Sequence, residues 1–422
     1  RGLGDVYKRQ VKKEEDIMKK FNKFLSVAVA SAMVMAMAGC GNTDNGSAAT
    51  GTNAATESAA ASDSAASGSV FKIGGIGPTT GGAAVYGLAV QHGAEIAVEE
   101  INAAGGINGY QVEFKFQDDE ADAEKSVNAY NALKDWGAQI IDGSTTSGAC
   151  IAVTDKTKED NMFQITPSGS AVECVQYDNN FRVCFSNPNQ GLASAQYIGE
   201  NGLAEKIAVI YDSSDVYSSG IYEKFVKEAE NQPFEVVAAE AFTADNKTDF
   251  SVQLQKAKDA GADMVFLPIY YQESALILTQ AAAMGYAPKW FSCDGMDGIL
   301  GGVDNFDVSL TEGVMLLTPF AADATDDLTQ SFVTKYKEKY GDTPNQFAAD
   351  SYDAIYVIKA AIEKSGVTPD MSVSDICDGM KAAMTEITVD GLTGSGMTWT
   401  ADGEANKAPK AVVIENGAYK AM

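Results

Sequence analysis

The sequence has 422 residues, 45% of them hydrophobic and 21% charged, which is a globular composition with enough length for two domains. The formal net charge of −27 argues against nucleic acid as a partner, because binding phosphates requires a basic surface. The one histidine, His92, falls in a predicted helix and cannot supply a hydrolytic triad or most metal sites. We therefore expect no enzyme, no metal site and no cofactor.

The N-terminal part divides into three segments. Residues 1–17 mix both charges without an apolar period, and we interpret them as a non-native leader. Residues 18–39 contain lysines, a short apolar run and small residues before Cys40, a pattern that resembles a bacterial lipobox and predicts a lipoprotein signal peptide with Cys40 lipidated. The alternative is an ordinary signal peptide with a buried cysteine. Residues 40–69 are rich in Ser, Ala, Thr and Gly, and we predict a lipid anchor followed by a flexible linker.

A first series of alternating strands and helices begins at residue 70. Apolar runs predict strands at 70–76, 110–116 and 138–141. Helical periodicity follows the first strand from Tyr86, and a second helix is predicted over 122–135. This order implies a parallel sheet with helices on both faces.

A second series of similar pattern follows and predicts a second lobe. Its strands are expected at 207–211, 234–240, 264–267, 290–292 and 314–317, and its helices at 217–231, 250–260 and 273–284. Three amphipathic helices are predicted after it, at 328–340, 347–365 and 373–385. The C-terminal end is predicted to form two β segments, 394–400 and 408–415, across a turn at Asp402-Gly403.

Two loops rich in small hydroxyl residues attract attention as a binding site. They are Ile141–Gly148 and Ile165–Ser170, and helix-like sequence follows the first of them from Ala149. A strand, a Ser/Thr/Gly loop and a helix together leave free backbone N–H groups at a positive helix end, which suits a carboxylate. The alternative is an ordinary strand-to-helix turn, in which Ser and Gly are common anyway.

Several motifs, taken together, resemble one protein family. They are Gly77-Pro78, Gly81 and Tyr86-Gly87, then AVEEINAAGGINGY (97–110), Gln117-Asp118-Asp119, Ile165-Thr166-Pro167-Ser168, NNFRVCFSNPNQG (179–191), IAVIYDSSDVYSSG (207–220) and QFAADSYDAIY (346–356). This set resembles the branched-chain amino acid type of periplasmic binding protein over roughly residues 70–415. The resemblance implies two Rossmann-like β/α lobes joined by three crossovers, with a ligand in the central cleft. Lobe 1 would take 70–188 and 319–388, and lobe 2 would take 189–318 and 389–422.

The resemblance also implies roles for individual residues. Ser147 and Ser170 match the positions that hold the ligand carboxylate, and Ser168 would offer its carbonyl to the ammonium. Asp294 matches the carboxylate that pairs with the ammonium, although Asp-Gly is also a common turn signal.

Aromatic residues complete the implied site. Tyr217 and Tyr270 match tyrosines of lobe 2 that cover the ligand, with one extra residue (Val216) before Tyr217, and Tyr86 matches an aromatic of the side-chain pocket. For Tyr271, plain packing is the better interpretation.

Five cysteines follow Cys40, and they lack paired metal spacing. Cys174 and Cys184 are close enough in sequence to form a disulfide in an exported protein, and the alternative is that they are small buried hydrophobic residues.

The function implied by the resemblance is capture of an amino acid, first of all a branched-chain one, and its delivery to the permease of an ABC transporter. The protein would be a monomer, lipid-anchored at the outer face of a bacterial cytoplasmic membrane. The alternative is a receptor or sensor of the same fold that binds another small carboxylate or an amide.

Overall fold

The structure is a computed structural model that describes residues 68–422. The predicted leader (1–17), signal peptide (18–39) and lipidation site Cys40, with nearly all of the linker, lie outside the described residues.

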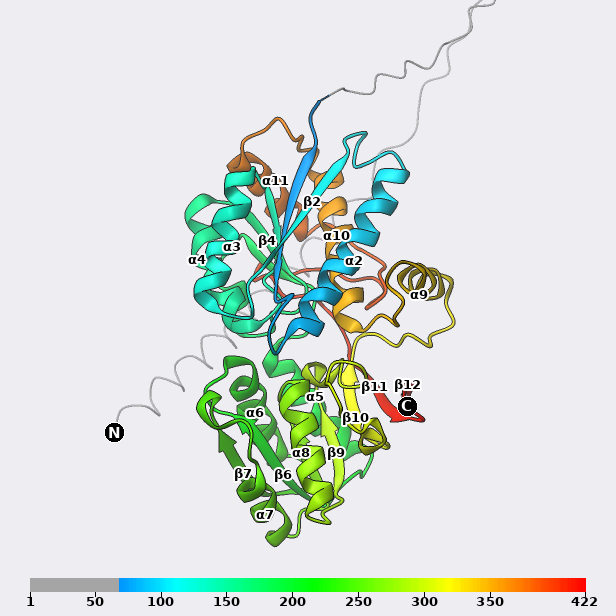
Figure 1. The fold of residues 1–422 in the computed structure, drawn as a ribbon. Helices are drawn as coiled ribbons and strands as arrows, with labels where there is room; N and C mark the ends of the chain where they lie inside the picture. The colour runs from blue at the N-terminus through cyan, green and yellow to red at the C-terminus, as the bar shows by residue number, and fades with distance from the viewer. Residues whose placement is uncertain (1–67) are drawn as a thin grey trace, which may run out of the picture. The chain divides into compact units, whose positions relative to one another are not determined.

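Lobe 1 is built around a parallel five-stranded sheet in the order β2-β1-β3-β4-β5. Its strands are β1 (Phe71–Gly77), β2 (Val112–Asp118), β3 (Ile140–Asp142), β4 (Phe163–Thr166) and β5 (Asn180–Arg182). The helices are α2 (Ala84–Ala103), α3 (Ala123–Trp136), α4 (Ser147–Asp160), α9 (Asp327–Tyr340), α10 (Gln346–Ser365) and α11 (Val373–Met384), with the short 3-10 helix η1 (Val172–Val175). Helices α2 and α10 pack together on one face of the sheet, and α3 and α4 pack together on the other (Figure 1).

Lobe 2 is built around a seven-stranded sheet in the order β12-β11-β10-β9-β8-β6-β7. The strands are β6 (Lys206–Asp212), β7 (Glu235–Phe242), β8 (Met264–Leu267), β9 (Lys289–Ser292), β10 (Met315–Thr318), β11 (Lys410–Glu415) and β12 (Ala418–Ala421). Strands β6–β10 are parallel, and β11 and β12 are antiparallel additions at one edge. The helices are α5 (Asn187–Glu200), α6 (Val216–Ala229), α7 (Ser251–Asp259) and α8 (Tyr271–Ala283), with the 3-10 turns η2 (Ala244–Asn246), η3 (Asp294–Met296) and η4 (Val308–Thr311).

Within residues 68–422 the chain passes between the two sheets three times. The crossings run from β5 to α5, from β10 to α9 and from α11 to β11. The predicted α/β fold of two lobes joined by three crossovers is therefore confirmed. The strands of both series could be predicted from the sequence because a strand covered on both faces is a continuous apolar run. Strand β8, with the sequence MVFL, is an example.

The C-terminal prediction was wrong in its pairing. The segment 394–400 forms only isolated bridges, and the turn at 402–403 brings Trp399 opposite Ala405. Strand β11 instead pairs with β10 and with β12. The β11–β12 turn contains Asn416 and Gly417, both with positive φ, which is the backbone that a two-residue hairpin turn requires.

Helix α5 is an element that the sequence analysis did not predict. The side chain of Ser186 accepts a hydrogen bond from the backbone N–H of Asn189, and Pro188 lies in the first turn. Both features are ordinary helix-start signals, and they lie within the motif that was used only for the resemblance.

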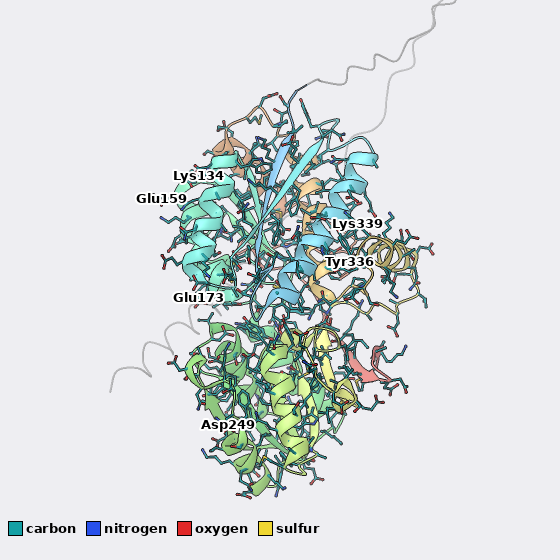
Figure 2. All side chains as sticks on the ribbon, in the orientation of Figure 1. Lys134, Glu159, Glu173, Asp249, Tyr336 and Lys339 are labelled. Atoms are coloured by element: carbon teal, nitrogen blue, oxygen red, sulfur yellow. The ribbon has the colours of Figure 1, made fainter. Side chains whose placement is uncertain are left out.

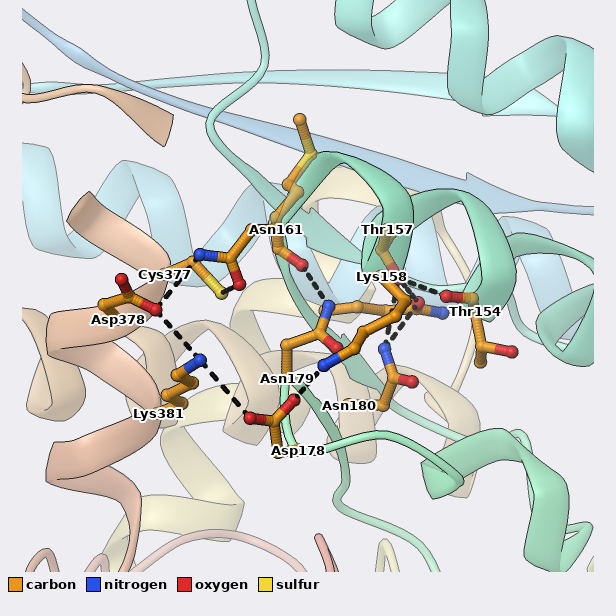
Figure 3. A network of polar contacts seen from close by, with 12 residues as sticks. Thr154, Thr157, Lys158, Asn161, Asp178, Asn179, Asn180, Cys377, Asp378 and Lys381 are labelled. Atoms are coloured by element: carbon orange, nitrogen blue, oxygen red, sulfur yellow. Dashed lines mark hydrogen bonds and ion pairs between the residues drawn. The ribbon is translucent and has the colours of Figure 1, made fainter. Parts of the chain in front are cut away.

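Polar side chains stay mainly at the surface, as Figure 2 shows for the exposed residues Lys134, Glu159 and Asp249. One surface network ties α11 to the rest of lobe 1 (Figure 3). Asp178 accepts hydrogen bonds from Lys158 of α4 (2.6 Å) and Lys381 of α11 (3.3 Å). Such exposed ion pairs contribute little stability, so the helix is held mainly by its buried face.

Candidate ligand-binding site

A cavity lies where strand ends of both lobes meet. It is lined by Tyr86, Thr145, Thr146, Ser147, Ser168 and Phe347 of lobe 1 and by Tyr217, Tyr270, Asp294 and Gly295 of lobe 2. Most of these residues follow the carboxyl end of a parallel strand, which is where open α/β sheets bind ligands.

The two hydroxyl-rich loops of lobe 1 are tied to each other through Ser147. Its Oγ accepts hydrogen bonds from the backbone N–H groups of Ser170 and Ala171, both at 3.1 Å, and lies 3.5 Å from Ser170 Oγ. Ser168 Oγ donates to the carbonyl of Thr145 at 2.6 Å. Because Ser147 Oγ serves as an acceptor for the loop, its own hydrogen remains available to a ligand anion.

The start of α4 adds to this anion site. The first N–H groups of a helix have no partner within the helix, and among the described residues no side chain caps α4 at Thr146. The partial positive charge of a helix N-terminus favours an anion there.

A buried arginine braces the second loop, and the sequence analysis missed it. The guanidinium of Arg182, at the end of β5, donates to the carbonyls of Ser170 (2.7 Å) and Ala171 (2.9 Å). It also forms an ion pair with Glu404 at 3.4 Å. These hydrogen bonds to Arg182 hold the loop that carries Ser170 in place.

On lobe 2, Asp294 stands at the start of η3 and is only 5% exposed. Tyr217 Oη donates to its Oδ1 at 2.6 Å, and Gln190 Nε2 donates to its Oδ2 at 2.8 Å. Burial raises the pKa of Asp294 to about 7, although these two hydrogen bonds favour the charged form. A ligand cation would restore the charge on this carboxylate, because an opposite charge in a dry site favours ionisation.

Aromatic rings form the remaining walls of the cavity. Tyr86 packs against Phe347 with ring centroids 4.3 Å apart, and Tyr217 stacks on Tyr270 at 5.1 Å. Tyr86 Oη donates to the carbonyl of Gly295 and accepts from the backbone N–H of Tyr271 at 3.2 Å. A lobe-1 side chain thus bonds directly to the lobe-2 backbone, so this contact belongs to the closed arrangement of the lobes.

The structure brings the predicted site residues together. Six of them line the cavity, namely Tyr86, Ser147, Ser168, Tyr217, Tyr270 and Asp294. Ser170 lies behind Ser147 and contacts it. Tyr271 is buried and packs against Tyr86, which agrees with its interpretation as a packing residue.

Four lining residues were not predicted. Thr145, Thr146 and Gly295 lie within two positions of a predicted residue, so the sequence analysis had already singled out the segments that contain them. Phe347 comes from α10, far along the chain. The sequence analysis included it only as part of the motif at 346–356, without a role in the site.

The cysteines do not pair in the way considered from sequence. All five cysteines of residues 68–422 are buried free thiols, so a Cys174–Cys184 disulfide is not formed in this structure. Cys174 packs with Cys150, its Sγ donates to the carbonyl of Ser147 at 3.7 Å, and burial raises the pKa of Cys184. The neighbour of Cys174 is set by the docking of η1 on α4, which sequence spacing does not show.

Residues 68–422 contain neither a metal-binding cluster nor a membrane-spanning helix. This part of the chain holds no group of three or more His, Cys, Asp or Glu side chains arranged for a metal ion. None of its helices combines the length and the apolar character that crossing a membrane requires.

Two α/β lobes with a cavity between them, lined by hydroxyl groups, aromatic rings and one buried carboxylate, have the architecture of a solute-binding protein. A family model described as periplasmic binding protein matches residues 70–418. The chain therefore belongs to the periplasmic binding protein family, whose members bind solutes outside the cytoplasm and are not enzymes.

Individual relatives agree with this assignment. The chain is similar to Leu/Ile/Val-binding protein homolog 3 of Brucella melitensis, with 30% identity over 71% of this chain and 80% of the relative. It is also similar to the leucine-, isoleucine-, valine-, threonine- and alanine-binding protein of Pseudomonas aeruginosa, with 30% identity over 70% and 78% of the two chains. The crystal structure of the branched-chain amino acid transporter substrate-binding protein LivJ from Streptococcus pneumoniae, in complex with isoleucine, matches with a TM-score of 0.75 and 28% identity, covering 84% of this chain and 99% of the other.

Proposed function

We propose that this protein captures a small amino acid between its lobes, first of all a branched-chain one, and delivers it to the permease of an ABC transporter. The observation that carries the proposal is the position of the buried carboxylate of Asp294, which lines the same small cavity as the hydroxyl loop at the N-terminus of α4. An anion site and a cation site across one cavity suit a zwitterion. The relatives named for leucine, isoleucine and valine support the aliphatic ligand class.

Binding begins on lobe 1 in this proposal. The hydroxyl of Ser147, the N–H groups at the start of α4 and Ser170 take the α-carboxylate. The carbonyl of Ser168 offers one hydrogen bond to the ammonium. Lobe 2 then closes, Asp294 pairs with the ammonium, and the ligand loses its contact with water.

The tyrosines finish the enclosure. Tyr217 and Tyr270 cover the ligand from lobe 2, and Tyr86 bridges the lobes while it faces the ligand side chain. Lobe 1 would comprise 70–188 and 319–388, and lobe 2 would comprise 189–318 and 389–422. ATP hydrolysis belongs to another subunit of the transporter.

The N-terminal part extends the proposal to the membrane. Cys40, after removal of residues 18–39, would carry the lipid, and residues 41–69 would tether a monomeric binding unit to the outer face of the membrane. Labelling of intact cells with a fatty acid, compared between the natural chain and Cys40→Ser, tests the anchor. Incorporation that persists in Cys40→Ser would refute lipidation at this cysteine.

A ligand screen tests the binding function. Purified residues 41–422 are tested by thermal shift and calorimetry against the twenty amino acids, their amides and short carboxylates. We expect leucine, isoleucine or valine to raise the melting temperature and to bind with micromolar or tighter affinity, that is about −8 kcal/mol or better. Absence of a response to every amino acid would refute the proposal, and a response only to ligands without an ammonium would favour a receptor of another solute.

A further inference from the structure

One glutamine of lobe 1 contacts the turn that carries Asp294 at two points. Gln346, the first residue of α10, is 1% exposed and is not among the residues that line the cavity. Its Nε2 donates to the main-chain carbonyl of Asp294 at 3.0 Å, and its backbone N–H donates to Oδ2 of Asp297 at 2.9 Å. Because α10 packs on the sheet of lobe 1 whereas η3 belongs to lobe 2, both hydrogen bonds cross between the lobes.

The backbone hydrogen bond uses a group that α10 itself leaves free. The first N–H groups of a helix have no acceptor within the helix, and they carry a partial positive charge. The carboxyl group of Asp297, which is 4% exposed, supplies an acceptor from the other lobe. The start of a 20-residue helix of lobe 1 is therefore docked on a side chain of lobe 2.

The side-chain hydrogen bond acts on the backbone of the residue that is proposed to meet the ligand ammonium. The Oε1 of Gln346 lies 3.2 Å from Oγ1 of Thr318 at the end of β10, so both ends of the amide face lobe 2. The carboxylate of Asp294 is held from within lobe 2 by Tyr217 and Gln190. Lobe 2 thus orients the side chain of Asp294, while Gln346 connects its backbone to lobe 1.

Separation of the lobes would break both hydrogen bonds, because their partners lie on opposite sides of the hinge. In an open form water can replace each partner. In the closed form water is excluded, and a buried polar group that lacks a partner is costly. The two bonds therefore stabilise the closed form relative to the open one.

We propose, on the basis of the proposed function, that Gln346 is a positioning residue for ligand binding. It ties the turn 294–297 to lobe 1 when the lobes close, and it thereby holds Asp294 against the ligand ammonium. Gln346 does not touch the ligand, and its bonds to lobe 2 form only after lobe 1 has captured the ligand. Loss of the side-chain bond should therefore speed dissociation of the ligand and leave association nearly unchanged.

The test compares the natural protein with Gln346→Met by calorimetry and stopped-flow kinetics with L-leucine. Methionine keeps the length of the side chain and removes the amide. We expect the dissociation constant to rise roughly tenfold, because one hydrogen bond is lost and the buried carbonyl of Asp294 is left unpaired. The rise should come from the dissociation rate constant, with the association rate constant within about twofold. If Gln346→Met folds poorly, Asp297→Ala, which removes the acceptor at the start of α10, should change the same rate constant in the same direction.

A control separates closure of the lobes from ordinary stability. Gln139 lies within lobe 1, where its Nε2 donates to the carbonyl of Pro369 (2.8 Å) and its Oε1 accepts from the backbone N–H of Lys72 (3.1 Å). Gln139→Met should lower the melting temperature of the ligand-free protein and leave the dissociation of leucine unchanged. Gln346→Met should leave the melting temperature of the ligand-free, open protein unchanged and lower that of the leucine-bound protein.

Two results would overturn the inference while leaving the proposed function intact. One is an unchanged dissociation rate constant for leucine in Gln346→Met and in Asp297→Ala. The other is a lower melting temperature of ligand-free Gln346→Met without faster dissociation, which would give Gln346 a purely structural role. Failure of the natural protein to bind any amino acid would refute the proposed function itself, and the inference with it.

Discussion

Asp294 offers the sharpest test of the zwitterion site. In Asp294→Asn the shape is kept, but the negative charge that would face a ligand ammonium is lost. Removing one partner of a buried charge pair typically weakens binding by about 2–5 kcal/mol, or roughly 30-fold to several thousand-fold, because the other charge is left buried and unpaired. Calorimetry with L-leucine measures this loss. The control ligand is 4-methylpentanoate, which is leucine without its ammonium, and the variant should bind it no more weakly than the natural protein does.

The pH dependence provides a second readout of the same group. Burial raises the pKa of the ligand-free carboxyl of Asp294 to about 7, so below that pH the group must release a proton before it can pair with an ammonium. The affinity for leucine should therefore fall as the pH falls, by roughly tenfold between pH 8 and pH 6 for a single group of this pKa. The affinity of Asp294→Asn for leucine should not show this tenfold change between pH 8 and pH 6.

The stability of the ligand-free protein should move in the opposite direction. The unfolded chain ionises Asp294 near its ordinary pKa of 3.8, whereas the folded chain keeps the proton up to about pH 7. Within this window the group lowers the free energy of unfolding as the pH rises, by at most about 1.4 kcal/mol per pH unit. Asp294→Asn should thus be more stable than the natural protein at pH 8.

Two results would refute the assignment of Asp294 to the ammonium. One is an equal loss of affinity for leucine and for 4-methylpentanoate in Asp294→Asn, and the other is an unaltered pH dependence of leucine binding in this variant.

Three further predictions concern the packing around the site. Lys407 and Asp350 form an ion pair whose side chains are only 1% and 3% exposed. Lys407→Met should therefore lower the free energy of unfolding in urea by about 3–5 kcal/mol, because the buried Asp350 loses its partner. A loss below ~1 kcal/mol would contradict this. Gly93→Ala should cost about 1–3 kcal/mol, since the added Cβ would lie 2.0 Å from a backbone oxygen of α10, whereas Gly301→Ala, which meets nothing within 4 Å in the described chain, should stay within roughly 0.5 kcal/mol. Tyr86→Phe removes hydrogen bonds to two lobe-2 backbone groups and should weaken leucine binding by about 1–2 kcal/mol in calorimetry; full affinity would show that these bonds do not hold the closed form.

The regular elements of both lobes could be predicted because their signals are local. A buried parallel strand such as 264–267 is a short apolar run, and the structure has β8 at these same residues. The helix predicted at 373–385 ends within one residue of α11, whose apolar positions repeat with the helical period. The C-terminal hairpin was misplaced because Asp402-Gly403 and Asn416-Gly417 are both turn signals, and the local sequence does not show which of the two joins paired strands.

The alternation of strands and helices and the hydroxyl-rich loops follow from the sequence alone, and the family resemblance adds the expectation that Asp294 faces those loops. The groups that support these loops and Asp294 become visible only when distant segments are packed together. Gln190 bonds to Asp294, Arg182 braces the second loop, and Phe347 closes a wall from a helix far along the chain. The two hydrogen bonds of Gln346 to the turn 294–297 are likewise contacts between segments that lie far apart in the sequence. Local patterns fix hydrogen bonding along the backbone, whereas burial and partnership are set by contacts between distant segments.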